Sequence, residues 1–325
     1  MNIMEKPYVV GIDIGGQTAK IGLVDARGNV LVQTAIRSDE TDDYKKFIND
    51  LCDAIVKLVS KEYKMDQVRG IGIGAPNGNF YKGTIENAVN LKFGGIKVIP
   101  FTEIMSKKIG LPVRLTNDAN AAAVGEMTYG AARGMNNFIM ITLGTGVGSG
   151  IVVGGSVLYG HDGFAGELGH VTMVRKNGRL CGCGKTGCLE AYASATGVAR
   201  SAREQLEATD RKSLLRNIPA ENITSKDVFE AAMQGDELAK DIFDFTGNML
   251  GEALSDFIAF SSPEAIVLFG GLTKSGDLIM KPVVESMNAN VMPLWKNKIK
   301  VLFSQLNESD AAILGASALA WEIKD

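Results

Sequence analysis

Three of the four cysteines stand close together in "CGCGKTGCLE", as Cys181, Cys183 and Cys188. Clustered cysteines in a reducing compartment hold a metal or act as thiols more often than they form disulfides. His170, one of only two histidines, precedes them and would complete a tetrahedral Cys₃His zinc set. The spacing is not that of a standard zinc finger, so a redox centre and simple packing remain alternatives. Cys52, far from the cluster, is predicted to be a small buried apolar residue.

Two glycine-rich turns are candidates for phosphate binding. "DIGGQTAK" spans 13–20 and "GTGVGSG" spans 144–150, each after an apolar strand. Glycine lets backbone N–H groups approach an anion without a Cβ in the way. Neither turn is a Walker A motif, and a strand rather than a helix follows each, which excludes the dinucleotide fingerprint. A purely structural hairpin is the alternative.

Carboxylates stand beside two of these predicted strands. Asp13 ends a buried strand, where a carboxylate is costly unless it is solvated or near a metal. We therefore predict that Asp13 is a second-sphere ligand of Mg²⁺ bound to nucleotide phosphates. Asn117 and Asp118 stand where a strand becomes a helix, so a simple helix N-cap is the alternative to a role in chemistry.

Composition limits the class of protein. The chain has 325 residues, a formal net charge of -3 and a pI near 5.6, which argues against nonspecific binding of nucleic acid. No stretch approaches 18 consecutive apolar residues, so no membrane span is expected. The N-terminus runs straight into a strand without a signal peptide, and we expect a cytoplasmic protein.

The predicted elements alternate between strands and helices, which favours a mostly parallel sheet covered by helices. The pattern strand, glycine turn, strand, turn, strand occurs twice, beginning at Tyr8 and again at Phe138. Such a long period indicates a duplicated domain. Two α/β lobes that each direct a glycine turn at a shared cleft would suit a bound nucleotide. The polar stretch 205–226 is expected to be a surface excursion.

Five segments together resemble the ROK family of sugar kinases and repressors: "GIDIGGQTAKIGLVD", "LTNDANAAAVGE", "LGTGVGSGIVVGG", "GFAGELGHVTM" and "CGCGKTGCLEAYAS". The resemblance extends from about residue 8 to 320, in family order. It implies a two-lobed, actin-like and hexokinase-like ATPase fold, built from duplicated ribonuclease H-like domains. We expect a small lobe at 1–117, completed by a helix at about 309–325, and a large lobe with the zinc site at 118–308. Family repressors carry an N-terminal helix-turn-helix, for which this chain has no room, so a kinase is expected.

The resemblance also implies roles for residues at matching positions. Asp118 is implied to be the general base, and His170 is implied to bind zinc through one ring nitrogen and the sugar through the other. Structural zinc is implied at His170, Cys181, Cys183 and Cys188. The implied sugar contacts are Asn90, Asn117, Asp118, Glu167, His170 and Glu190.

The same resemblance implies a nucleotide site at Asp13, Gly15, Gly16, Gln17, Lys20, Gly144, Thr145, Gly146, Gly270 and Gly271. Gln17 stands where the family usually has threonine, and its amide can still donate a hydrogen bond to a phosphate oxygen. A structural glycine is the alternative at Gly270 and Gly271, and a helix-start carboxylate is the alternative at Glu190. His161 is expected at a pocket rim or on the surface.

The sequence thus predicts an ATP-dependent hexose kinase that uses ATP, Mg²⁺ and structural Zn²⁺. Glucose is the first expected acceptor, and N-acetylmannosamine or N-acetylglucosamine is the alternative; fructose and allose are less favoured. A non-catalytic sugar sensor is the alternative from another class. By analogy with the family, a homodimer or homotetramer is expected.

Overall fold

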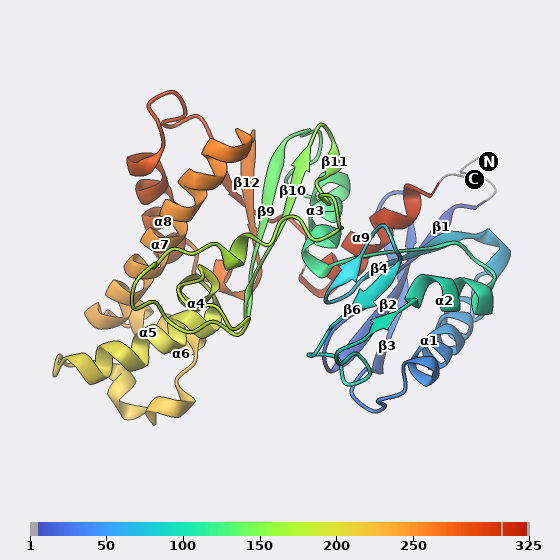
Figure 1. The fold of residues 1–325 in the computed structure, drawn as a ribbon, viewed down its shortest axis with the longest axis horizontal. Coiled ribbons are helices and arrows are strands. Elements are labelled where there is room, and N and C mark those ends of the chain that lie inside the picture. Colours follow the sequence, from blue (N-terminus) through green and yellow to red (C-terminus); the bar gives the residue numbers. More distant parts are fainter. Residues whose placement is uncertain (1–5, 307, 324–325) are drawn as a thin grey trace. The chain divides into compact units, whose positions relative to one another are not determined.

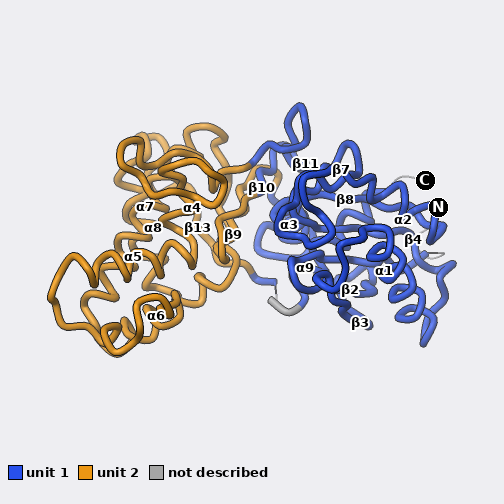
Figure 2. The backbone as a smooth tube through the Cα atoms, turned by 60° about the horizontal axis from the view of Figure 1, so that its bottom comes forward, with its two compact units in different colours: residues 1–135, 150–166, 305–325 blue, residues 136–149, 167–304 orange. Residues whose placement is uncertain are grey.

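The computed structural model describes residues 6–306 and 308–323 and divides into two compact units (Figure 2). The first unit takes its described residues from 1–135, 150–166 and 305–325, and the second from 136–149 and 167–304. The helix that follows Asn117 belongs to the first unit, whereas the sequence prediction assigned it to the large lobe. The predicted lobe boundaries themselves stay a prediction, and residues 324–325 of the predicted last helix lie outside the described residues.

The first unit is built on a five-stranded sheet with strand order β3-β2-β1-β4-β8 (Figure 1). Strands β1 to β3 run antiparallel as consecutive hairpins, whereas β4 and β8 run parallel to β1. Strands β1 to β3 form the strand–turn–strand–turn–strand pattern that the sequence predicts from Tyr8 onward. The bounds are β1 (Tyr8–Ile14), β2 (Thr18–Asp25), β3 (Val30–Arg37), β4 (Val68–Gly74) and β8 (Val113–Thr116).

In α1 (Tyr44–Val59) and α2 (Phe101–Ile109) the apolar residues recur on one face, which packs in the core of this unit. Asp43 caps the first helix by accepting a hydrogen bond from the Lys45 amide, and Phe47 of that helix stacks on Phe93 at 4.3 Å between ring centroids. Cys52 is buried in the same core, as predicted. The helices are α1 (Tyr44–Val59), α2 (Phe101–Ile109), α3 (Asp118–Tyr129) and α9 (Glu308–Trp321).

The last helix, α9, lies directly on the backbone of strands β1 and β4 (Figure 1). A Cβ on Gly11 would stand 2.1 Å from the Ile313 carbonyl oxygen, and one on Gly72 would stand 1.9 Å from that of Ala316. Only glycine permits this approach, so the small residues of α9 and the glycines of the sheet require each other.

A small sheet, in the order β5-β6-β7, adjoins the first unit's main sheet. Its strands are β5 (Gly78–Asn79), β6 (Thr84–Glu86) and β7 (Val98–Ile99), and a 3₁₀ turn η1 (Met65–Gln67) precedes β4. The buried Asn79 side chain donates to the Asp162 carbonyl oxygen at 2.8 Å, and Phe80 stacks on Tyr159 at 4.1 Å. These contacts fix the loop that leads to Glu167.

The second five-stranded sheet has strand order β11-β10-β9-β12-β13, with β9, β12 and β13 parallel. Strand β9 begins at Phe138, as the predicted repeat required, and the same strand–turn–strand pattern follows. The third strand of this copy is far shorter than β3. The bounds are β9 (Phe138–Leu143), β10 (Val147–Val153), β11 (Ser156–Val157), β12 (Ala265–Phe269) and β13 (Lys300–Phe303).

Apart from β9, β12, β13 and the first residues of β10, the second unit is mainly helical. Gly247 and Gly251 let α7 pack closely on α8, since a Cβ at either position would stand about 2.5 Å from Pro282 or Val283. The elements are η2 (Leu168–His170), α4 (Glu190–Ala193), α5 (Ala195–Ala208), η3 (Leu214–Asn217), η4 (Ala220–Asn222), α6 (Ser225–Met233), α7 (Glu237–Ser261), η5 (Gly271–Ser275) and α8 (Asp277–Asn290).

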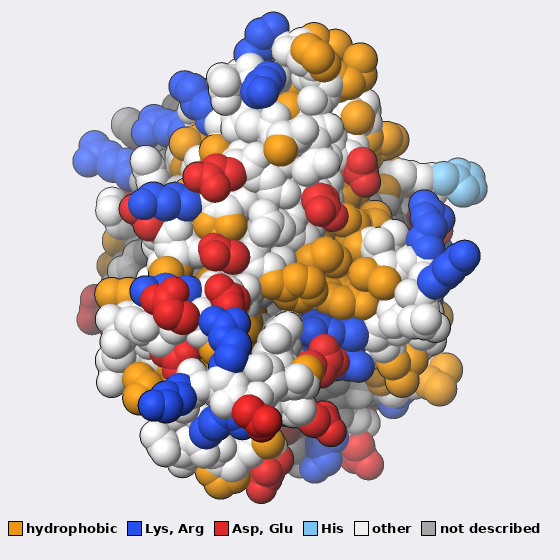
Figure 3. Space-filling model, turned by 90° about the vertical axis from the view of Figure 1, so that its left-hand side faces the viewer, with side chains coloured by type: hydrophobic (Ala, Val, Ile, Leu, Met, Phe, Trp, Pro, Cys, Tyr) orange, Lys and Arg blue, Asp and Glu red, His pale blue; other side chains and the backbone are white. Residues whose placement is uncertain are grey.

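The polar stretch 205–226 holds the end of α5 and the short turns η3 and η4. On the face that Figure 3 views, Lys and Arg side chains gather toward the upper left, and lower down they are intermixed with Asp and Glu. Within 6–306 and 308–323, every helix is too short or too polar to cross a membrane.

Candidate functional site

Two carboxylates stand together in the first unit. Asp13 lies near the end of β1 and Asp118 is the first residue of α3. Desolvation, reinforced by the charge of Asp118 and opposed by that of Lys20, raises the pKa of Asp13 to about 6. Desolvation also raises the pKa of Asp118, which accepts a hydrogen bond from the Ala119 amide at 2.9 Å. Near neutral pH, an acidic pair of this kind can take up a proton or be stabilised by a nearby cation.

Asn117 is the N-cap of α3, because its side-chain oxygen accepts a hydrogen bond from the Asn120 amide at 2.7 Å. The capping alternative is therefore present in the structure. The cap uses only the oxygen of the Asn117 amide, so the side-chain nitrogen keeps its two donors.

Ser38, which lies outside the hairpin, holds two carbonyl groups of the first glycine turn (15–18). The buried Ser38 donates from Oγ to the Gly15 oxygen at 2.6 Å and from its backbone amide to the Gln17 oxygen at 3.0 Å. Among the described residues, none accepts a hydrogen bond from the amides of Gly16 and Gln17. The turn therefore presents two backbone donors without partners, which suits an anion.

The second glycine turn, at 144–147, is arranged in the same way. The start of α5 holds two of its carbonyl groups: the Ala195 amide donates to the Gly144 oxygen at 2.9 Å, and Thr196 Oγ1 donates to the Thr145 oxygen at 2.7 Å. Within the described chain, the amides of Thr145 and Gly146 have no hydrogen-bond acceptor. This turn, too, can receive an anion.

The predicted metal ligands come together in the second unit. One ligand atom from each of His170, Cys181, Cys183 and Cys188 lies within 4.8 Å of the others. The Sγ atoms of Cys183 and Cys188 are 3.7 Å apart, and Cys181 Sγ is 3.8 Å from His170 Nδ1. Two sulfur ligands of tetrahedral zinc, each at about 2.3 Å, would be about 3.8 Å apart. The donor set and its spacing fit a four-coordinate zinc ion.

Local backbone chemistry shapes this cluster. Gly187 has a φ of 80°, and a Cβ there would stand 1.9 Å from the Val174 carbonyl oxygen, so only glycine fits. The chain turns back at Lys185, whose carbonyl accepts from the Cys181 amide at 2.8 Å. Burial raises the pKa of Cys181 to about 12, so its sulfur carries a proton unless a cation replaces it.

Two of the predicted sugar contacts adjoin the cluster. His170 Nε2, the ring nitrogen that faces away from the cysteines, is 3.9 Å from the Glu167 carboxylate. Glu190 begins α4 and points its carboxylate at both the turn and the cluster: Oε2 accepts from the Val147 amide at 3.0 Å and Oε1 from Cys181 Sγ at 3.3 Å. The structure thus brings Glu167, His170 and Glu190 into one neighbourhood.

The remaining predicted residues are scattered around these centres. Asn90 is exposed in a loop. Its own backbone oxygen lies near Gly16, because a Cβ on Gly16 would stand 3.0 Å from that oxygen. Lys20 is exposed on β2, and His161 is exposed in the loop after β11. Gly270 has a φ of 107°, and a Cβ there would stand 2.7 Å from the Leu143 oxygen, so its glycine is required structurally.

A cavity of about 580 Å³ in the second unit adjoins the second turn. Gly144, Thr145 and Gly271 of the predicted set line it. Sequence reasoning missed its other walls: Leu143, Ala195, Ser225, Lys226, Phe229, Glu230, Phe243, Leu272, Lys274 and Ser275. An apolar cavity of this size with an anion-binding turn at its edge suits an aromatic base joined to phosphates.

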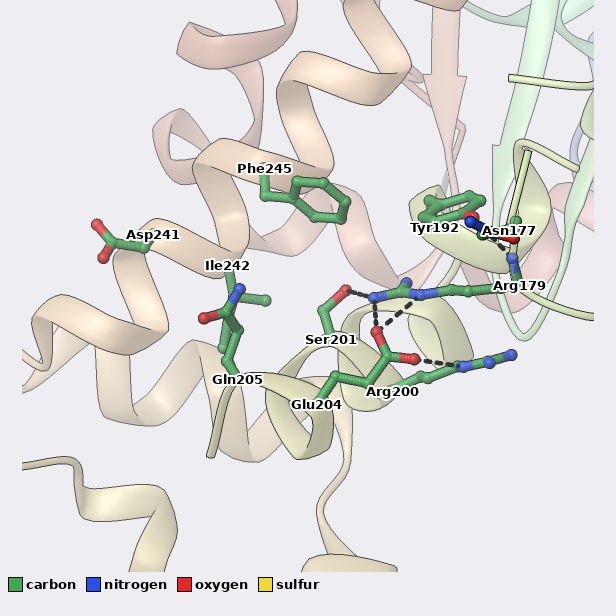
Figure 4. Close-up of a pocket in the computed structure, with 11 residues that line it drawn as sticks. Asn177, Arg179, Tyr192, Arg200, Ser201, Glu204, Gln205, Asp241, Ile242 and Phe245 are labelled. Carbon is green, nitrogen blue, oxygen red and sulfur yellow. Dashed lines mark hydrogen bonds and ion pairs between the residues drawn. The ribbon is translucent and has the colours of Figure 1, made fainter. Parts of the chain in front are cut away.

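A second cavity, of about 410 Å³, lies beside Arg179 (Figure 4). The Arg179 guanidinium packs over the Tyr192 ring and donates to Ser201 Oγ and to the Glu204 carboxylate, which Arg200 also binds. Arg179 and Arg200 share the single carboxylate of Glu204, so this group keeps one net positive charge. The arrangement braces the backbone before Cys181 against α5.

The chain belongs to the ROK family, which it matches over residues 9–323. It is 36% identical to the glucokinase of Halalkalibacterium halodurans over 99% of this chain and 96% of that protein. It is 34% identical to the glucokinase of Thermotoga maritima over 98% of this chain and 99% of that protein. The fold matches the crystal structure of a ROK glucokinase from Streptomyces griseus in complex with glucose and AMPPNP, with a TM-score of 0.79, 33% identity, and coverage of 97% and 100% of the two chains. The predicted family and fold class are confirmed.

Proposed function

We propose that this chain is an ATP-dependent sugar kinase that phosphorylates a hexose hydroxyl, with glucose as the first acceptor. The observation that carries the proposal is the acidic pair Asp13 and Asp118 beside a glycine turn with two amides that no described residue accepts from. Full-length similarity to glucokinases, one of them solved with glucose and an ATP analogue, supports it.

In this proposal, Asp118 accepts the proton of the attacking sugar hydroxyl as that oxygen approaches the γ-phosphate. Burial raises the pKa of Asp118 toward neutral pH, and a general base works best when its pKa lies near the pH of the reaction. Asp13 would approach Mg²⁺, which neutralises charge on the phosphates when it is bound. Each turn would offer backbone hydrogen bonds to phosphate, and the 580 Å³ cavity of the second unit would take the adenosine.

The sugar would be recognised by fixed hydrogen-bonding groups at Asn90, Asn117, Glu167, His170 and Glu190. Zinc would serve as a structural ion, since four protein ligands leave no position for a reacting water. Assembly as a homodimer or homotetramer, and action in the cytoplasm, belong to the same proposal by analogy with the family.

N-acetylmannosamine is the second candidate acceptor. The chain is 31% identical to an N-acetylmannosamine kinase of Escherichia coli O157:H7 over 96% of its length. A sugar sensor is the other alternative, because the xylose repressor of Caldicellulosiruptor bescii is 28% identical over 96% of this chain and 77% of that protein.

A coupled assay of ADP release tests the proposal, with MgATP and glucose, N-acetylmannosamine, N-acetylglucosamine, fructose or allose. We expect the highest kcat/KM with glucose. Turnover only with an N-acetylated hexosamine would keep the kinase and change its acceptor. Sugar binding in calorimetry without ADP release from any of the five would replace the kinase by the sensor.

A further inference from the structure

One side chain, that of Glu190, contacts both the second glycine turn and the cluster of predicted metal ligands His170, Cys181, Cys183 and Cys188. Glu190 Oε2 accepts the hydrogen bond of the Val147 amide at 3.0 Å, and Oε1 accepts one from the Cys181 thiol at 3.3 Å, a bond that is available only while no cation has displaced the thiol proton. The contact with the turn is close, because a Cβ on Gly146 would stand 2.3 Å from the same carboxylate oxygen. Val147 is the residue at which the turn becomes β10.

The backbone of Glu190 is fixed from the cluster side. The backbone oxygen of Cys188, one of the four predicted metal ligands, accepts a hydrogen bond from the Ala191 amide at 3.0 Å. The Leu189 amide donates to the Val171 oxygen at 3.0 Å. Helix α4 has only four residues, too few to hold its own position without neighbours. The loop that carries the cysteines therefore sets where the Glu190 carboxylate stands.

We infer that Glu190 is a positioning residue that makes the affinity of the second turn for nucleotide depend on metal occupancy of the cluster. The inference rests on the proposed function, because it takes the turn to bind phosphate. A bound ion holds the loop 181–188 in one conformation. Without it the loop gains freedom, Glu190 loses its place, and the Val147 amide loses its acceptor.

Thr196 provides the matched reference. It holds the same turn through the Thr145 oxygen at 2.7 Å, but it does so from α5, and its other hydrogen bond is to Ser194. Loss of Thr196 Oγ1 should weaken the turn in the presence and in the absence of the metal. Loss of Glu190 should weaken the turn and also abolish its response to the metal.

The experiment is a cycle of metal removal and mutation, with Kd for MgAMPPNP measured by calorimetry without sugar. Zinc-loaded and chelated protein are compared for the parent, Glu190→Ala and Thr196→Val. A hydrogen bond to a charged group is lost on chelation, so we expect the parent to bind about tenfold more weakly. Glu190→Ala should be weak in both states, and Thr196→Val should keep the tenfold response. An equal response in Glu190→Ala and the parent, or none in the parent, would overturn the inference.

Hydrogen exchange of the Val147 amide provides a second readout that needs no nucleotide. We expect chelation to speed its exchange about tenfold in the parent and not in Glu190→Ala. Glu190→Gln keeps an acceptor oxygen and should restore the dependence on metal, which separates lost positioning from a failure to fold. If MgAMPPNP does not bind the parent at all, the proposed function fails. The exchange rates still decide the role of Glu190 in that case.

Discussion

The glycine turns of the two units are held by the same device and stand in different chemical surroundings. In each, a hydroxyl side chain from outside the hairpin, Ser38 or Thr196, donates to a turn carbonyl and leaves two amides without partners among the described residues. Beside the first turn stand the carboxylates Asp13 and Asp118. Beside the second stand the predicted metal ligands His170, Cys181, Cys183 and Cys188, of which Cys181 contacts Glu190. The repeat thus keeps the backbone geometry of anion binding while the neighbouring side chains differ.

The largest effect should come from removing the acid chemistry of the first unit. Asp118→Asn should lower kcat about 10²–10⁴-fold, because the amide cannot accept the hydroxyl proton. Sugar and nucleotide binding should stay within a few-fold, and steady-state kinetics with calorimetry would check both. Asp66→Asn, at an exposed carboxylate of the same unit, is the control. A parallel loss of sugar affinity would make Asp118 a binding residue.

The pH dependence of the first unit should reflect the pKa of about 6 at Asp13. If ionised Asp13 supports Mg²⁺, kcat/KM for MgATP should fall as pH drops below about 6. Stability should change in the opposite direction: the folded pKa lies above the unfolded value of 3.8, so the Asp13 contribution to the free energy of unfolding rises as pH falls from about 6 to about 4.

Asp13→Asn should remove both effects at once. At pH 7 it should raise the free energy of unfolding by at most about 3 kcal/mol, since it removes a desolvated charge. Denaturant titrations and rate profiles at several pH values measure the two changes. An unchanged acid limb in the variant would assign the titration to another group.

The smallest effect should come from the hydroxyl that holds the first turn. Ser38→Ala leaves the Gly15 oxygen without its buried donor, at a cost of about 1 kcal/mol. We expect KM for MgATP to rise about three- to tenfold with kcat little changed. Thr196→Val should act similarly at the second turn. A much larger effect at one turn would show that this turn contributes more to nucleotide binding than the other.

Local patterns were sufficient for much of this molecule. Apolar runs between glycines predicted both hairpins, and the combination of residue types predicted the cluster of His170 with three cysteines. Ser38 and Thr196 could not be predicted as holders of the turns. Serine and threonine are common, and their partners here are backbone carbonyls that carry no sequence signal. Phe229, a wall of the larger cavity, resembles any apolar residue of a helix.

The unit to which α3 belongs was also not evident from the sequence. Gly125 of α3 faces Gly315 of α9, and a Cβ on Gly125 would stand 2.7 Å from the Gly315 Cα. This close pairing of two distant helices packs α3 into the first unit. Small residues on both helices permit it, but neither segment alone indicates its partner.

The packing of α9 on Gly11 and Gly72 has a consequence for biosynthesis. Strands β1 and β4 leave the ribosome early, yet the helix that covers them follows every residue of the second unit in the chain. Domains usually complete folding in N-to-C order during synthesis. Here the later-made unit has all its residues before the earlier-made one does. The nascent sheet must therefore keep an apolar face exposed, or shielded by a chaperone, until translation has passed residue 321.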